Sequence, residues 1–249
     1  RGLYAFAAVM FTLKAIITYV MTEETAQGRV RLHETRHQSA LSMLSEYQGV
    51  LREILRTPQT LYTAGIMLVV SISALISGSF WAIIVTTKLH IQAQNLALFP
   101  LLKSAIILSF FFVVMPRLNK MHYKLPMMIG FLGFVASQLV LIAAPDQGYI
   151  FLIVSVFLEA CSFAAVSPLV DQMAVLTINP QERARILSIL YVGIILLTSP
   201  FGWIAGTLSA LNKDLPFMLN IALFAAGAVL AYLAGQASQK RLAADVAAA

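Results

Sequence analysis

Long apolar runs with at most two charged residues each constrain this chain more than any other feature. Seven are present: Gly2–Met21, Thr60–Thr87, Leu96–Met115, Leu125–Ala144, Gly148–Leu176 (interrupted by Glu159 and Asp171), Ile186–Leu208 and Leu215–Ala237. About 20 residues cross roughly 30 Å of hydrocarbon as an α-helix. A membrane β-strand instead needs alternation over about ten residues, and these runs are continuously apolar. The sequence therefore predicts an all-α, polytopic membrane protein with about seven transmembrane helices.

The composition agrees and excludes other classes. Charged residues make up 11% of the chain and hydrophobic residues 59%, against about 25% charged in soluble domains. The single Cys161 lies inside a run, so no intrachain disulfide is expected. The histidines fall in loops or at run edges without ligand spacing, which predicts no metal site. No nucleophile with a base occurs at membrane depth, so we expect neither an enzyme nor a cofactor.

Basic residues are distributed unevenly between the two ends of the runs. Twelve share the side of the 22–59 loop: Arg29, Arg31, Arg36, Arg52, Arg56, Arg117, Lys120, Lys124, Arg183, Arg185, Lys240 and Arg241. The other side has Arg1, Lys88 and Lys213. Because basic loops stay in the cytoplasm, we expect a cytoplasmic C-terminus in a bacterial inner (plasma) membrane. This asymmetry accounts for the net charge of +6 and does not indicate nucleic-acid binding.

The connection at 22–59 is the only long one. Its second part predicts an amphipathic helix at 40–57, with apolar residues three and four apart: Leu41, Leu44, Tyr47, Leu51, Ile54 and Leu55. Such a helix lies at the membrane surface or against the bundle. The chain is thus expected to comprise a helix at 1–21, a cytoplasmic connector at 22–59, a six-helix bundle at 60–237 and a cytoplasmic tail at 238–249.

This organisation resembles the C-terminal half of a major facilitator superfamily transporter, with the central loop and the last helix of the N-terminal half. The segment 179–185 (NPQERAR) and Ser188 are similar to the P-x-x-x-R-x-R/K pattern between helices ten and eleven. Pro200, Gly202 and Gly206 then follow as in many eleventh helices. The turn at 116–124 (PRLNKMHYK) occupies the place of the basic motif between helices eight and nine, without its Asp-Arg pair and glycines.

The resemblance implies a secondary transporter that works by alternating access, with a small-molecule substrate and a coupling proton at a midplane cavity. It also implies a missing N-terminal half, which would supply much of the site. The first and fourth helices of each half line the cavity in this family. Here these are the runs 60–87 and 148–176.

Both runs carry a polar stripe. Ser73, Ser77 and Trp81 lie four apart on one, and Ser155, Glu159 and Ser162 share a face of the other. We expect these six residues to face the cavity, with Tyr191 reaching it from the next helix. The alternatives are that the serines serve helix packing and that Trp81 is an interfacial anchor.

Glu159 is the most informative residue, because a carboxylate inside an apolar run faces a protein interior or a wet cavity. Lys103 lies at a similar depth in its own run, so the two could pair. The pair is either a permanent ion bridge or a contact that opens when Glu159 takes a proton or an anionic substrate replaces it. Asp171, nearer the cytoplasm, is expected to form a gate-like contact with Arg183 or Arg185.

Two other function classes stay open. The number of runs also fits a seven-helix receptor or retinal protein, although the last run has no lysine for a Schiff base. An intramembrane enzyme would need the catalytic groups that the runs lack. A membrane scaffold without transport is a further alternative.

Overall fold

The computed structural model describes residues 2–21, 57–118, 123–177 and 183–248. Helices are its only regular elements within these ranges, and eight of them are α-helices. The chain divides into two compact units, Arg1–Gly49 and Val50–Ala249. The first unit contributes one described helix, α1 (Gly2–Met21), and the second contains the helix bundle.

The bundle follows the apolar runs closely. Its helices are α4 (Pro58–Thr87), α5 (Leu98–Val113), α6 (Met115–Leu118), α7 (Lys124–Ile142), α8 (Tyr149–Thr177), α9 (Arg183–Leu211) and α10 (Leu215–Ala248), with a short 3₁₀ turn at Ala93–Asn95. Pro58 opens α4, where a proline costs no helical hydrogen bond. Pro168 and Pro200 lie inside α8 and α9 and each removes one such bond.

Among the described residues, five helices are long and apolar enough to cross a membrane: Pro58–Thr87, Lys124–Ile142, Tyr149–Val175, Ile186–Leu211 and Leu215–Ala237. The continuous part of α1 whose side chains are described, Ala8–Met21, and helix α5 (Leu98–Val113) are apolar but shorter than these five. The expected run Leu96–Met115 forms a shorter helix because the helix is interrupted at Val114, between α5 and α6. The protein is therefore a helical membrane protein with five candidate spans, where the sequence predicted about seven. The amphipathic helix predicted at 40–57 lies outside the described residues, apart from Thr57.

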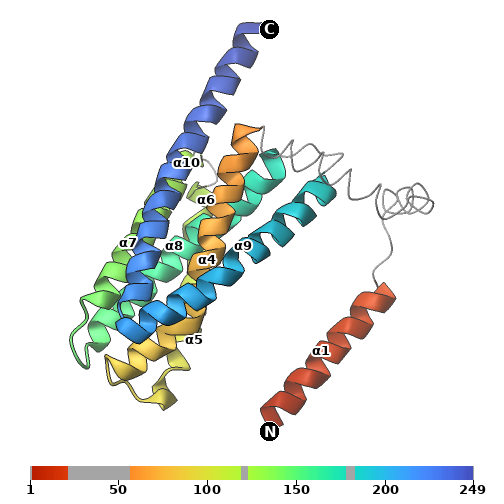
Figure 1. Cartoon of the computed structure of the whole chain (residues 1–249). Coiled ribbons are helices and arrows are strands. Elements are labelled where there is room, and N and C mark those ends of the chain that lie inside the picture. The colour runs from red at the N-terminus through yellow and green to blue at the C-terminus, as the bar shows by residue number, and fades with distance from the viewer. Residues whose placement is uncertain (1, 22–56, 119–122, 178–182, 249) are drawn as a thin grey trace. The chain divides into compact units, whose positions relative to one another are not determined.

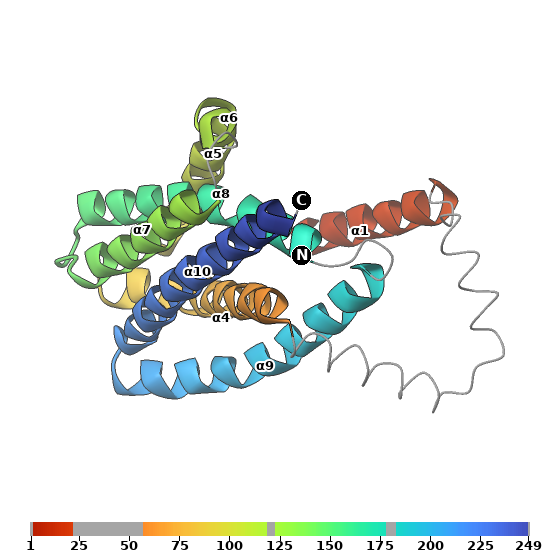
Figure 2. The same ribbon diagram turned by 90° about the horizontal axis from the view of Figure 1, so that it is seen from above.

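Helix α4 lies in the middle of the bundle and contacts α8, α9 and α10 (Figures 1 and 2). Helix α7 packs on α8 and α10, and α5 packs on α8. Helix α9 lies at one edge, and α10 extends beyond the ends of its neighbours (Figure 1). Helix α8 therefore touches α4, α5 and α7, which places its polar residues among three neighbouring helices.

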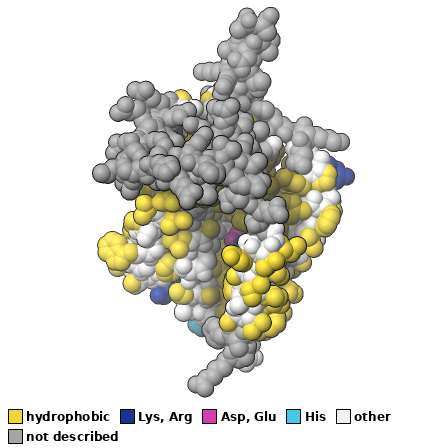
Figure 3. Space-filling model, turned by 90° about the vertical axis from the view of Figure 1, so that its right-hand side faces the viewer, with side chains coloured by type: hydrophobic (Ala, Val, Ile, Leu, Met, Phe, Trp, Pro, Cys, Tyr) yellow, Lys and Arg dark blue, Asp and Glu magenta, His cyan; other side chains and the backbone are white. Residues whose placement is uncertain are grey.

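Aromatic and aliphatic side chains fill the space between the helices. Phe134 and Phe224 stack across α7 and α10 with ring centroids 4.5 Å apart, and Ile66, Met127 and Val166 belong to the same core cluster. Hydrophobic side chains also cover much of the described surface in Figure 3, where few charged ones are visible. An apolar interior with an apolar exterior is what a bilayer as solvent permits.

Lys88 ties three elements together at one end of the bundle. Its ammonium group donates to Asp214 Oδ1 at 2.8 Å and to the carbonyl oxygen of Ile142 at 2.7 Å. Lys88 directly follows α4, Asp214 precedes α10, and Ile142 ends α7. This contact fixes the ends of α4, α7 and α10 relative to one another.

Helices α7 and α8 approach each other closely, because small residues line their contact. The hydroxyl of Ser137 donates to the carbonyl of Ser155 at 2.9 Å, and that of Ser155 donates to the carbonyl of Ser137 at 3.0 Å. Four residues away on α7, a Cβ added to Gly133 would overlap Ser162 Oγ. Position 133 therefore requires glycine, because the Ser162 side chain occupies the space that a Cβ would need.

We expect Gly133→Ala to lower the free energy of unfolding by about 1–3 kcal/mol, because overpacking forces neighbouring groups to shift. Ser162→Ala removes the overlapping oxygen and should recover part of this loss in the double variant. Gly78→Ala is the matched control, since a Cβ there has no neighbour within 4 Å. Thermal unfolding in detergent is measured for the wild type, the two single variants, the double variant and the Gly78→Ala control. Strictly additive effects at 133 and 162 would show that the two positions do not interact.

Candidate functional site

A cavity of about 370 Å³ opens between α4, α5, α7, α8 and α10. Four of its lining residues are polar: Ser73, Ser77, Lys103 and Glu159. The other eleven are Val70, Ala74, Gly78, Trp81, Ala82, Phe99, Pro100, Phe134, Val156, Phe163 and Phe224. Small-molecule sites commonly enclose about 300–1,000 Å³ and combine apolar walls with a few polar groups. This cavity has that character.

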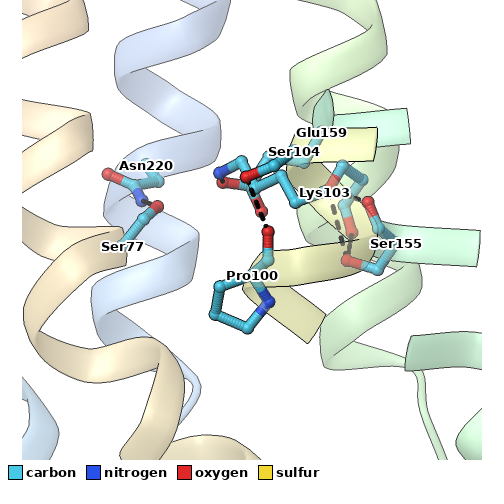
Figure 4. A network of polar contacts seen from close by, with 8 residues as sticks. Ser77, Pro100, Lys103, Ser104, Ser155, Glu159 and Asn220 are labelled. Carbon is cyan, nitrogen blue, oxygen red and sulfur yellow. Dashed lines mark hydrogen bonds and ion pairs between the residues drawn. The ribbon is translucent and has the colours of Figure 1, made fainter. Parts of the chain in front are cut away.

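An ion pair joins α5 and α8 in the wall of the cavity. Lys103 Nζ donates to Glu159 Oε1 at 2.7 Å (Figure 4). The Glu159 residue is 9% exposed, and the ammonium group also lies 5.8 Å from the centroid of the Phe163 ring. The carboxylate that stood out in the sequence is therefore neutralised by the lysine at similar depth. Charge pairing of this kind is the usual way to hold an ionised group within a membrane protein.

The polar stripe of α4 faces the cavity along two turns. Ser73 is 2% exposed, and its hydroxyl has no partner among the described residues. Ser77 accepts a hydrogen bond from Asn220 Nδ2 at 3.2 Å (Figure 4). The indole of Trp81 packs edge-on against Phe99 at 5.7 Å, and its buried Nε1 has no partner within the described part of the chain. Buried polar groups without partners are rare and call for a ligand or water.

The stripe of α8 divides between two surroundings. Glu159 lines the cavity, whereas Ser155 bonds to Ser137 and Ser162 lies against Gly133, both on α7. The physical reason is rotation about the helix axis. At about 100° per residue, Glu159 is turned roughly 40° from Ser155 and Ser162 about 20° the other way. The expectation that all three face the cavity is corrected: Ser155 and Ser162 serve helix packing.

Two further predicted residues, Tyr191 and Asp171, are not among the residues that line the cavity. Tyr191 is 49% exposed on α9, and its expected contact with a substrate stays a prediction. Asp171 is exposed toward the C-terminal end of α8. Arg183 and Arg185 begin α9, but their side chains lie outside the described ones. The gate-like contact of Asp171 with these arginines therefore stays a prediction.

Several lining residues carried no signal in the sequence. Phe99, Phe134, Phe163 and Phe224 come from four different helices, and a phenylalanine in an apolar run is indistinguishable from one that faces lipid. Asn220 supports Ser77 and is fully buried. As an amide deep inside its apolar run, it could have been found by the argument that singled out Glu159.

Comparisons with known proteins give no match: no protein-family model fits the sequence, and a search of curated proteins finds none similar to it. The site's own chemistry therefore carries the functional argument. Among the described residues no group of three or more potential metal ligands lies together. The cavity offers instead an ion pair, hydrogen-bond donors and aromatic walls, which suit binding of a small molecule.

Proposed function

We propose that this chain is part of a secondary active transporter that moves a small solute across the membrane by alternating access. The observation that carries the proposal is the cavity of about 370 Å³ whose apolar wall contains the Lys103–Glu159 pair. A static bundle gains little from such a pair, because burying two charges costs about as much as their attraction returns. In a transporter, by contrast, an ion pair that can open would allow the protein to bind and release a solute.

The resemblance to the C-terminal half of a major facilitator superfamily transporter supports the proposal. In that arrangement α4 and α8 are the first and fourth helices of the half, and both contribute polar residues to the cavity. Helix α1 and α5 would complete seven spans, a second half would complete the site, and the basic loops would face the cytoplasm. The lipid bilayer is the solvent for the apolar exterior.

We further propose that a proton couples to transport at Glu159. Protonation of its carboxylate cancels the charge that holds Lys103 at 2.7 Å. The freed ammonium group can then bind substrate, and loss of the proton restores the pair and releases the substrate. One group thus links occupancy by the solute to occupancy by the proton.

The test uses the full-length protein in liposomes that contain a pH-sensitive dye. Organic anions, amino acids, sugars and lipophilic cations are added one class at a time under a pH gradient. We expect one class to drive proton movement in the wild type, and Glu159→Gln to abolish it. Asp146→Asn is the control, because Asp146 is exposed in the loop between α7 and α8. Undiminished proton flux in Glu159→Gln would refute the coupling role. Alternating access would be refuted if solute uptake occurred without any change in the labelling of residues on the two sides of the membrane.

A further inference from the structure

Several hydrogen-bond donors in the cavity lining have no partner among the described residues. The indole Nε1–H of Trp81 only donates, and it has no partner among the described residues. The buried Ser73 hydroxyl is equally unpartnered. Ser77 accepts from Asn220, which leaves its own hydrogen to donate. Lys103 carries three N–H groups, of which one bonds Glu159.

The single negative charge among the described lining residues already has a partner. Glu159 is the one carboxylate in the lining, and its Oε1 already accepts from Lys103. A cationic ligand would have to displace that ammonium group and would leave the indole and serine donors unsatisfied. A sugar would face walls made mainly of aromatic rings and aliphatic groups, against which its hydroxyl groups would lose their hydration.

We propose that the cavity binds a small carboxylate with an aromatic or otherwise apolar body. The carboxylate takes the place of Glu159 beside Lys103, since carboxylate oxygens accept strongly from an ammonium group. Glu159 takes up a proton at the same time, so that no unpaired charge stays in the wall. The Trp81 and Ser73 donors bind further acceptor atoms of the ligand. Its body packs against Phe99, Phe134 and Phe224, which line the same cavity.

Benzoate is the probe, and benzamide and benzylamine are its neutral and cationic counterparts with the same ring. Binding to the full-length protein in detergent is followed by tryptophan fluorescence. Trp81 lines the cavity, whereas Trp203 is 75% exposed on α9. The benzoate signal should therefore persist in Trp203→Phe and vanish in Trp81→Phe. Benzoate should bind at least tenfold more tightly than benzylamine or benzamide.

Two variants test the contacts. Ser73→Ala should weaken benzoate binding about threefold to tenfold, the effect of one lost hydrogen bond. The double variant Lys103→Met with Glu159→Gln keeps the wall free of unpaired charge, and it should remove the preference for benzoate over benzamide. Ser104→Ala is the matched control, because Ser104 is exposed and bonds to the carbonyl of Pro100 on its own helix (Figure 4).

The inference rests on the proposed function in treating the cavity as a substrate site and in the protonation of Glu159, whereas the experiments let transport and benzoate binding fail separately. Benzoate binding that requires Trp81, without any transport, supports the inference and contradicts the transporter. Proton-coupled movement of sugars or cations without benzoate binding supports the transporter and contradicts the inference. Equal affinity for the three probes, no binding at all, or a benzoate signal that survives Trp81→Phe overturns the inference.

Discussion

Lys103→Met should lower the free energy of unfolding by about 3 kcal/mol, because it leaves the Glu159 carboxylate without its partner in an apolar wall. Thermal unfolding in detergent measures the loss. Lys213→Met is the control, since Lys213 is exposed in the loop between α9 and α10. That substitution removes the same charge without breaking a described contact.

Adding Glu159→Gln to Lys103→Met should recover most of the stability, because no unpaired charge then remains. If the single and double variants unfold alike, the two side chains are not coupled. The exchange variant, Lys103→Glu with Glu159→Lys, separates the two roles of the pair. Recovered stability without recovered transport means that the bridge holds the fold while the proton chemistry needs glutamate on α8.

Under the proposed function, Gly78→Leu should abolish transport and leave thermal stability nearly unchanged. Gly78 lines the cavity, and a Cβ at this position has no neighbour within 4 Å. The new side chain can therefore occupy the cavity without straining the backbone, and leucine favours the helix over glycine. Uptake of the transported solute into liposomes, together with thermal unfolding, measures both effects.

Gly206→Leu is the matched control for this substitution. Gly206 lies on α9, outside the cavity lining, and it too has open space around an added Cβ. It should keep transport. Equal loss in both variants would mean that helix mobility, and not cavity volume, limits the rate, and unchanged transport in Gly78→Leu would place the solute pathway elsewhere.

The fold class followed from the sequence because a bilayer imposes a length on every apolar helix. Five runs became helices of spanning length, with bounds within a few residues of those expected. The run 96–115 became the shorter α5 because the helix breaks at Val114. Hydropathy averages over a window and does not register such a local break.

The residues that line the cavity could be predicted from the sequence only in part. Glu159, Lys103 and the stripe of Ser73, Ser77 and Trp81 were found because polar groups are costly in an apolar run, and all five line the cavity. Ser155 and Ser162 were misplaced, because rotations of only about 40° and 60° from Glu159 about the helix axis turn them from the cavity to α7. The phenylalanine walls could not be predicted, since which face of an apolar helix meets lipid depends on its neighbours.

The 2.7 Å contact between Lys103 and Glu159 also determines how this region responds to the membrane potential. Moving one elementary charge through 100 mV costs about 2.3 kcal/mol. Two opposite charges that travel together carry no net charge through the field. As long as the pair stays closed, a rearrangement of α5 and α8 is therefore insensitive to voltage at this site, and the potential acts there only on what binds when the pair opens.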